Sequence, residues 1–365
     1  MACGGIVLPE ASAITLDWLT NMLHAAGSLA AGAPTSLEIE PLRSKPNSEL
    51  VRVRIGYDEK AAGERPPSVV LKIARRGVAN ATARRRRRKE HEFYAAIAPA
   101  MAVSPAPRAF AAAWDEATAG SHLALEDCST SHAPTPRGLP PTRAEAEAAV
   151  DVLSAIHAAW WGQPALRDGL PAPAQIAARA RPARRLVTDF LREMDDRVAA
   201  ATSRALGDVA DAYPALLAAS ASGPVTLLHG DSHPWNFLHP RRGGGRTILL
   251  DWESWSIGAG PNDLVALIAM RSLPDLRRER EAALLARYHA GLRAGGVTGY
   301  DWDDCWNDYR RGIARRLLAP LRLRRAGSDS WRMCLGCLAL AYHDLGCAET
   351  LPVAAEPAEE GERAP

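Results

Sequence analysis

Hydrophobic and polar residues alternate with the period of a β-strand through much of the first 130 residues. Apolar side chains recur at every second position, or run together over strand length, in Leu37–Leu42, Leu50–Tyr57 and Ser68–Ala74. Two more segments of this kind follow at Arg108–Trp114 and His122–Glu126. The pattern predicts a mainly β N-terminal region.

Helical spacing interrupts this region twice. Thr15 is a candidate N-cap for a helix with leucines at positions 16, 19 and 23, and Gly27 ends it. After the third strand, the basic run Arg84–Lys89 opens a helical pattern that continues through Ile97 and stops at Pro99. We expect the basic side chains to be solvated, because no nucleic-acid-binding motif accompanies them.

From Thr142 onward the pattern is mainly helical. Thr142 and Glu145 have the spacing of a capping box and begin a long helix that closes at Gly162. Helical periodicity returns from about residue 175 to 221 and again beyond residue 263. Short apolar strands lie between these stretches at Val225–Leu228 and Thr247–Asp251. The chain is therefore predicted to be α+β, with a small β-rich lobe followed by a large helical lobe.

Composition is that of a globular protein. The chain has 365 residues, 47% hydrophobic and 24% charged, and its formal net charge of +2 does not indicate a nucleic-acid partner. No apolar run approaches the ~18 residues that span a bilayer, and the first eight residues lack the pattern of a secretory signal. Six cysteines in a chain of this length do not indicate a disulfide framework. We expect a cytoplasmic protein without a membrane or nucleic-acid partner.

Three oxygen-bearing side chains flank the two short strands. Asp231 and Asn236 stand at the ends of a polar loop after the first strand, and Asp251 ends the second. If the two strands pair as a hairpin, two carboxylates and an amide oxygen converge. Hard oxygen ligands of this kind suit Mg²⁺. An Asp and an Asn at this spacing, followed by a later Asp, are also typical of a kinase catalytic loop.

The chain resembles the kinase-like small-molecule phosphotransferases, which include aminoglycoside phosphotransferases, choline kinases and ecdysteroid-kinase-like proteins. The resemblance rests on the motifs His229-Gly-Asp231 with Asn236, Asp251-Trp-Glu253 and Gly258-x-Gly-x-x-Asp263. It implies a two-lobed protein-kinase-like fold. It also implies Mg²⁺-dependent transfer of the γ-phosphate of ATP, or of GTP, to a hydroxyl group of a small molecule.

The resemblance assigns roles to the residues of these motifs. Asp231 would orient the attacking hydroxyl and accept its proton, and Asn236 and Asp251 would hold Mg²⁺. Glu253 would support the metal site, and His229 would position the backbone of the loop. Because catalysis of this kind is positioning plus electrostatics, loss of an aspartate should reduce the rate and leave the fold intact.

The same resemblance requires a lysine on the third strand and a helix glutamate that orients it. Lys72 is one of only four lysines in a chain that otherwise uses arginine. By analogy with the Arg-Glu-x-x-Phe-Tyr pattern of this family, which resembles Lys89–Tyr94 here, Glu90 is favoured over Glu92 as its partner. The loop over the phosphates, residues 43–49, contains no glycine, and Ser48 is expected to donate hydrogen bonds there.

Leu123–Cys128 is similar to the hinge between kinase lobes, where backbone groups near Glu126 and Cys128 would contact adenine. The nucleotide-binding lobe is therefore expected to span residues 1–128, and the helical lobe with the catalytic loop residues 129–351. Residues 352–365 are expected to be disordered. Asp263, at the start of a helix, is interpreted as a structural cap that also braces the catalytic loop.

Several questions stay open. Aminoglycoside, macrolide, amino alcohol and sterol-like acceptors all fit the motifs, and so do a monomer and a homodimer. The segment Tyr300–Tyr309 is either a wall for a cationic acceptor or, as we prefer, an amphipathic helix capped by Asp301 with Trp302, Trp306 and Tyr309 packed inward. The glycine-free loop leaves a kinase-shaped nucleotide-binding protein with little or no activity as the alternative function. A protein kinase is disfavoured, because so short a path from Asp251 to Asp263 leaves no room for a long activation loop.

Overall fold

The computed structural model describes residues 7–45, 48–74, 80–242 and 244–352. By compactness the chain divides into one unit of residues 1–137 and 235–255 and a second of residues 138–234 and 256–365. The segment 235–255, expected in the helical lobe, thus belongs to the first unit, and the lobe boundary at residue 128 stays a prediction. Residues 46–47 of the glycine-free loop and 353–365 of the tail lie outside the described residues.

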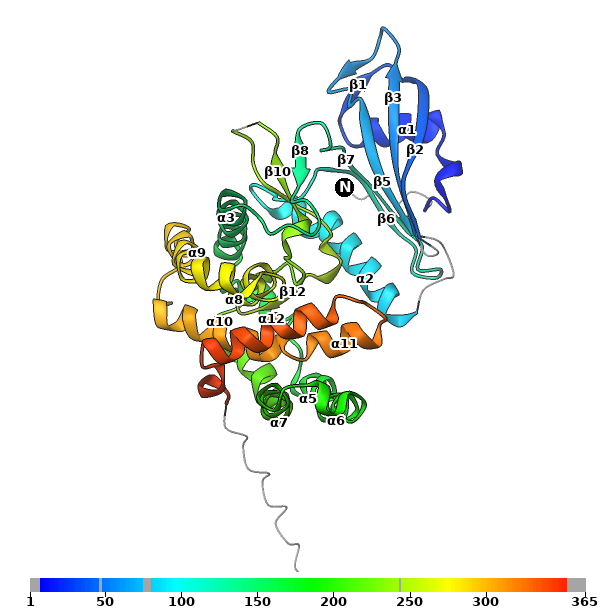
Figure 1. Ribbon diagram of the computed structural model, residues 1–365. Helices are drawn as coiled ribbons and strands as arrows, with labels where there is room; N and C mark the ends of the chain where they lie inside the picture. The colour runs from blue at the N-terminus through cyan, green and yellow to red at the C-terminus, as the bar shows by residue number, and fades with distance from the viewer. Residues whose placement is uncertain (1–6, 46–47, 75–79, 243, 353–365) are drawn as a thin grey trace, which may run out of the picture. The chain divides into compact units, whose positions relative to one another are not determined.

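A five-stranded antiparallel sheet forms the main part of the first unit, with its strands in the order β2–β3–β5–β7–β6 (Figure 1). These strands are β2 (Pro34–Lys45), β3 (Ser48–Tyr57), β5 (Ser68–Ala74), β6 (Ala109–Trp114) and β7 (Ser121–Glu126). All five were predicted, and β2 and β3 are longer than expected. The short pair β1 (Leu29–Ala31) and β4 (Ala62–Gly63) was not predicted.

Helix α1 (Leu16–Ala25) covers one face of this sheet (Figure 1). As predicted, Thr15 caps it, with Oγ1 accepting a hydrogen bond from the backbone N–H of Trp18. Leu19 and Leu23 are fully buried in the core between helix and sheet. The 3-10 turn η1 (Ala11–Ala13) precedes the helix.

Alternation along β5 determines which face of the sheet each side chain joins. Val69, Leu71 and Ile73 are fully buried in the core beneath α1. Because successive side chains of a strand point to opposite faces, Lys72 lies on the other face of the sheet. The period of the strand therefore sets the side on which the candidate site forms.

Helix α2 (Ala81–Glu92) follows β5 and continues through the π-helical turn η2 (Phe93–Ile97) into the 3-10 turn η3 (Ala98–Ala100). Asn80 caps the helix by accepting a hydrogen bond from Ala83 N–H. The prediction of helix through Ile97 is confirmed, and the basic run lies within α2.

A second, three-stranded sheet in the first unit corrects the predicted hairpin. It pairs β10 (Phe237–Pro240) with both β8 (His132–Pro134) and β11 (Ile248–Leu249), and the 3-10 turn η6 (Trp252–Ser254) follows. The predicted pairing of the segments at 225 and 247 is wrong, because β9 (Thr226–Leu228) pairs with β12 (Ser256–Gly258) instead. Strand β10 was missed because four residues ending in proline carry almost no periodic signal.

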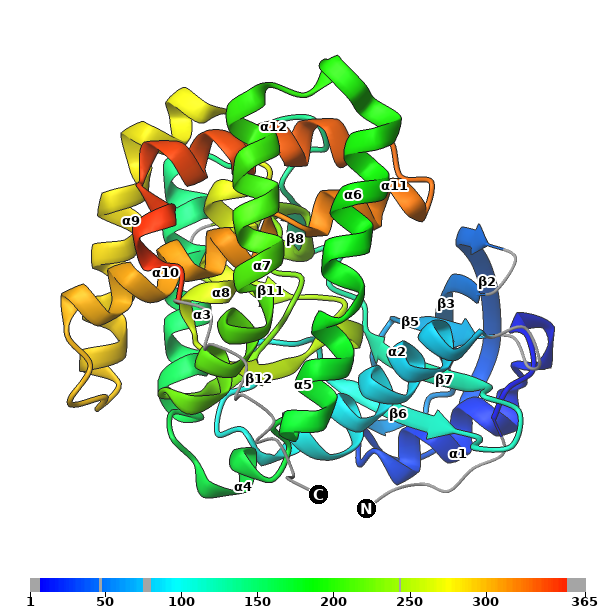
Figure 2. The ribbon, with the colours of Figure 1, turned by 90° about the horizontal axis from the view of Figure 1, so that it is seen from below.

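The second unit is mainly helical, and α6 and α7 lie side by side in it (Figure 2). The capping box of Thr142 and Glu145 at the start of α3 is confirmed, and α3 packs along α9. The helices are α3 (Arg143–Ala159), α4 (Pro164–Arg167), α5 (Pro173–Ala180), α6 (Pro182–Met194), α7 (Ala200–Ser222), α8 (Pro261–Leu264), α9 (Pro274–Ala294), α10 (Trp302–Arg316), α11 (Ala319–Arg325) and α12 (Trp331–Asp344). Shorter turns are η4 (Asp195–Arg197), η5 (Pro234–Asn236), the π-helical η7 (Val265–Ala269) and η8 (Cys347–Thr350).

The segment from Pro261 to Met270 is buried at every position. Its helix begins two residues before the predicted start at Asp263, because proline suits the first position of a helix. Across the described ranges, no helix combines the length and the apolar character needed to cross a bilayer. The predicted α+β class is confirmed.

Candidate functional site

A lysine between two carboxylates is the centre of the candidate site in the first unit. Lys72 Nζ lies 2.7 Å from Glu90 Oε1 and 2.8 Å from Asp251 Oδ1. Burial by itself would lower the pKa of Lys72, but the charges and hydrogen bonds of Glu90 and Asp251 raise it. The lysine is therefore held in its charged form.

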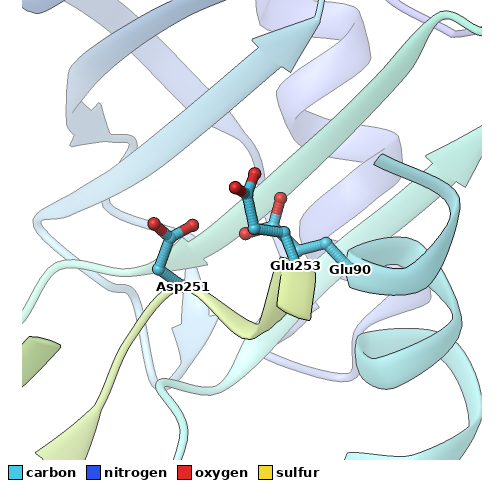
Figure 3. Close-up of side chains that lie close together, drawn as sticks. All are labelled: Glu90, Asp251 and Glu253. Atoms are coloured by element: carbon cyan, nitrogen blue, oxygen red, sulfur yellow. The ribbon is translucent and has the colours of Figure 1, made fainter. Parts of the chain in front are cut away.

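The two carboxylate partners of Lys72 lie close to a third carboxylate, that of Glu253 (Figure 3). Oxygen atoms of Glu90, Asp251 and Glu253 lie within 4.8 Å of one another. Burial raises the pKa of Glu90 to about 7, against the opposing effect of Lys72 and with the support of the neighbouring carboxylates. Arg86 pairs with Glu253 at 3.3 Å. Three carboxylates thus meet two cations, Lys72 and Arg86.

Contacts between α2 and η6 hold these carboxylates together. Lys89 Nζ donates a hydrogen bond to the carbonyl of Trp255 at 2.6 Å, and Trp255 Nε1 donates to the carbonyl of Lys89 at 2.7 Å. The rings of Phe93 and Trp252 stack with centroids 3.8 Å apart, and both are fully buried. Glu90 on α2 is therefore fixed beside the residues that flank η6.

The backbone of Asp251 has an unusual conformation. Its φ of 66° and ψ of 58° lie in the left-handed region, which few residues other than glycine adopt. Such strain persists where the surrounding structure enforces it, and it clusters at functional sites. Here the left-handed backbone conformation of Asp251 places its carboxylate against Lys72.

A pocket of about 520 Å³ opens beside this cluster. All of its lining residues belong to the first unit. Among them are eight of the residues predicted from the sequence: Ser48, Lys72, Glu90, Glu126, Cys128, Asn236, Asp251 and Glu253. A smaller pocket of about 320 Å³ shares Ser48, Lys72, Glu90 and Glu253. The volume of the larger pocket is in the range of small-molecule binding sites.

The end of β7 forms one wall of the larger pocket. The N–H of Glu126 donates to the carbonyl of Arg108, whereas within the described ranges no protein group accepts from the N–H of Cys128. Between them, Asp127 accepts hydrogen bonds from Ser68 and Arg52 at 2.7 Å each. Although burial alone would raise the pKa of Asp127, these bonds and that of Ser129 lower it to about 2. The bonds from Ser68 and Arg52 to the Asp127 side chain therefore hold the chain between Glu126 and Cys128 in place.

In the second unit, Asp263 holds the loop that contains His229 and Gly230. The Asp263 carboxylate accepts hydrogen bonds from the backbone N–H groups of His229 at 2.6 Å and Gly230 at 2.9 Å. Ser232 Oγ donates to the Asp263 carbonyl, and His157 Nε2 lies 3.4 Å from the carboxylate. Burial would raise the pKa of Asp263, but His157 and these loop contacts lower it to about 2. The carboxylate is therefore an internal brace of the loop.

Asp231 extends from this braced loop with its side chain about half exposed. Gly230 before it has a φ of 84°, which glycine adopts without strain. His233 Nε2 lies 3.9 Å from Asp231 Oδ2, and His229 Nδ1 accepts from the Asp231 N–H at 3.3 Å. Asp231 belongs to the second unit and Asn236 and Asp251 to the first, so their convergence stays a prediction.

Some residues of these clusters were not predicted from the sequence. Arg86, Lys89 and Arg52 all hold site residues in the first unit, and Arg316 donates a hydrogen bond to the carbonyl of Gly230 at 3.0 Å. Lys89 carried a signal, because lysine is rare in this chain. The arginines carried no such signal, because the chain has 40 of them and their roles depend on contacts distant in sequence.

The aromatic and acidic segment at Tyr300–Tyr309 is a helix start. Asp301 and Asp304 form a reciprocal capping box, and Asp308 accepts hydrogen bonds from the Tyr300 hydroxyl and from Arg311. Tyr309 is fully buried, as the helical pattern predicts. The inward packing predicted for Trp302 is wrong: it is 37% exposed and stacks on Trp306, since it stands in the first turn of the helix.

The model of a family described as the phosphotransferase enzyme family matches residues 50–304, more than half of the chain. No curated protein matches the chain in sequence.

Among solved structures, a point mutant of aminoglycoside 2′-phosphotransferase-IIIa in complex with GDP is 12% identical, with a TM-score of 0.50 over 86% of this chain and 92% of that one. A Ralstonia eutropha protein named as an aminoglycoside phosphotransferase is 16% identical, with a TM-score of 0.49 over 91% and 98%. Choline kinase LicA from Streptococcus pneumoniae is 15% identical, with a TM-score of 0.46 over 84% and 94%. At these identities the likeness is one of fold, and the predicted kinase-like fold is confirmed.

Proposed function

Because the chain belongs to the phosphotransferase enzyme family, we propose that it transfers the γ-phosphoryl group of ATP or GTP to a hydroxyl group of a small molecule. The names of its structural neighbours, which are small-molecule phosphotransferases, support this proposal. The observation that carries the proposal is the Lys72–Glu90–Asp251 cluster at the edge of a pocket lined by the predicted hinge. An ion-paired lysine on the third strand, beside a strained aspartate, is what a kinase uses to hold phosphates.

The nucleotide is proposed to occupy the larger pocket. Lys72, oriented by Glu90, provides a point charge for the α- and β-phosphates. Ser48, at the start of β3, lines both pockets and offers a hydroxyl donor in place of a glycine-rich turn. The Glu126 carbonyl and the Cys128 N–H supply an acceptor and a donor for the edge of the base.

The residues around Lys72 fit a divalent cation. Their donors are carboxylate oxygens, and Asn236 lines the same pocket with an amide oxygen. Asn236 and Asp251 would hold Mg²⁺, with Glu253 in support. The ion would neutralise charge on the phosphates.

Asp231 is proposed as the group that orients the acceptor. Its carboxylate accepts the proton of the attacking hydroxyl while the hydroxyl oxygen bonds to the γ-phosphorus. The bond from that phosphorus to the β,γ-bridging oxygen breaks, and ADP or GDP leaves with the electron pair. Asp263 fixes the loop so that Asp231 keeps its orientation.

The proposal is tested by screening nucleotide consumption with Mg²⁺ over chemically diverse alcohols. Asp231→Asn should lower kcat by at least about a hundredfold, the scale of a lost acid–base group, with an unchanged circular dichroism spectrum. Asp251→Ala serves as the control against contaminating kinases and should be equally inactive.

Two results would contradict the proposal. A near-normal rate in Asp231→Asn would show that the loop aspartate is not the acceptor of the proton. Calorimetric binding of nucleotide without turnover of any alcohol would favour the alternative of a kinase-shaped binding protein.

A further inference from the structure

Positive charge gathers around the loop that carries Asp231. Arg316, at the end of α10, donates from Nη2 to the carbonyl of Gly230, the residue directly before Asp231. Arg271 follows η7, and its charge affects the pKa values of His233 and Cys334, which the charge of Asp231 shifts in the opposite direction. Burial and then Arg271 lower the pKa of His233, whereas Asp231 raises it. The two arginines therefore approach the loop from different elements of the second unit.

The charge of Arg316 and of its neighbour Arg315 is not neutralised by an ion pair. In the part of the chain that the structure describes, neither guanidinium lies within 4.0 Å of a carboxylate oxygen. The Nε atoms of both are buried without a hydrogen-bond partner there. By contrast, other arginines of α10 and α11 pair with acids: Arg310 with Glu349, Arg311 with Asp308, Arg324 with Glu193 and Arg325 with Asp189.

Burial makes this excess of charge costly. It lowers the pKa of Arg315 to about 10, with Arg316 adding a like-charge repulsion. Both side chains are half-buried, and the nearby charge of Asp263 offsets only part of the cost of burying Arg315. An anionic ligand at the loop would offset more of it.

Four acidic residues at the start of α10 and at the base of the Asp231 loop are already engaged by protein groups. Asp301 and Asp304 cap α10, and Asp308 is bound by Tyr300 and Arg311. Asp263 is fully buried and holds the loop backbone. Asp231 is about half exposed, and Arg316 and Arg271 add two positive charges at the loop that carries it.

We propose that the acceptor carries an anionic group, a carboxylate or a phosphate, near the hydroxyl that is phosphorylated, and that Arg316 and Arg271 recognise this group. The inference rests on the proposed function and names the acceptor class of the same site. A polycationic acceptor is disfavoured, because like charges at the loop oppose its binding.

The test uses acceptors that differ only in charge. A sugar and a short polyol are each assayed as the neutral alcohol, the amine, the carboxylate and the phosphate ester, with steady-state kinetics and calorimetric binding for every form. The carboxylate and phosphate arms distinguish the two anions. We expect kcat/KM for one anionic form to exceed that of the neutral alcohol by about tenfold or more, and that of the amine to be lowest.

Substitutions then assign the effect. Arg316→Gln and Arg271→Gln should raise KM for the anionic form about tenfold more than KM for the neutral alcohol, and Arg316→Lys should retain part of the preference. Arg287→Gln is the matched control, since the charge of Arg287 is already paired with Asp151. A folding defect would reduce turnover of all forms alike, so the ratio between forms isolates recognition.

A preference for the amine, or an equal loss for all forms in Arg316→Gln, would overturn the inference while the proposed function stands. If no form is phosphorylated, the proposed function fails and calorimetry decides the inference. Binding of an anionic form that Arg316→Gln weakens would support it, and absence of binding would overturn it.

Discussion

Glu90 and Glu92 lie two positions apart in α2 and have different environments. Glu90 is 6% exposed and pairs with Lys72, whereas Glu92 points to the surface and pairs with Arg88 of its own helix. A surface pair within one helix contributes little to stability, whereas breaking a buried pair leaves an uncompensated charge. Burial thus distinguishes two residues of the same type.

Glu90→Gln should therefore impair nucleotide binding. Lys72 would keep its ion pair with Asp251 and would turn towards it, away from the phosphates. We expect KM for the nucleotide to rise about tenfold. Glu92→Gln is the control and should change it less than twofold; equal effects of the two substitutions in steady-state kinetics would contradict the assignment.

Asp263 gives a pH dependence of stability with a defined sign. Its pKa falls from 3.8 to about 2 on folding, so its ionised form stabilises the native state above pH ~4. This contribution, about 2 kcal/mol, is lost as pH falls from about 4 to about 2. Urea unfolding at several pH values should show a smaller decline across this window in Asp263→Asn than in the unaltered protein. Identical slopes would argue against the lowered pKa.

At the scale of elements, close packing around the start of α8 depends on one glycine. A Cβ at position 260 would lie 2.1 Å from the Tyr288 hydroxyl oxygen and 3.0 Å from His157 Nδ1. These two atoms are hydrogen-bonded at 2.8 Å, and His157 also contacts Asp263. The close approach of α8 to α3 and α9 therefore also positions His157, which contacts the carboxylate that holds the Asp231 loop.

Gly260→Ala should destabilise the protein by about 1–3 kcal/mol, because the added methyl group overpacks this contact. Gly207→Ala is the matched control, as a Cβ there, within α7, meets nothing within 4 Å. This second substitution should stabilise the helix by about 0.5–1 kcal/mol. Chemical denaturation of both variants measures the change in the free energy of unfolding. An unchanged value in Gly260→Ala would show that the rings of Tyr288 and His157 move to accommodate the methyl group.

At the scale of the whole molecule, ligand binding should be visible as stability. A ligand that binds only the native state stabilises it by about 2.7 kcal/mol at a concentration of a hundred times its Kd. We expect Mg²⁺ with ATP or GTP to raise the thermal midpoint by several degrees, and EDTA to remove the metal-dependent part. Asp251→Ala should lose that part, whereas Asp275→Ala, a change at a 97% exposed side chain, should keep it. A metal-dependent shift retained in Asp251→Ala would contradict the proposed metal site.

The sequence by itself determined the features that depend on neighbours along the chain. The caps at Thr15, Thr142 and Asp301, the strand that carries Lys72 and the α+β class all follow from local spacing, because helix and strand periods and cap hydrogen bonds span only a few residues. The family motifs lie in short segments for the same reason.

Only the tertiary structure decided which distant segments meet. It pairs β9 with β12 and β10 with β11, where the sequence had suggested a different hairpin. It brings Arg86 to Glu253 and Arg316 to Gly230, contacts that span well over 80 positions of the chain. Such pairings depend on summed burial and charge across the folded unit, which no local pattern encodes.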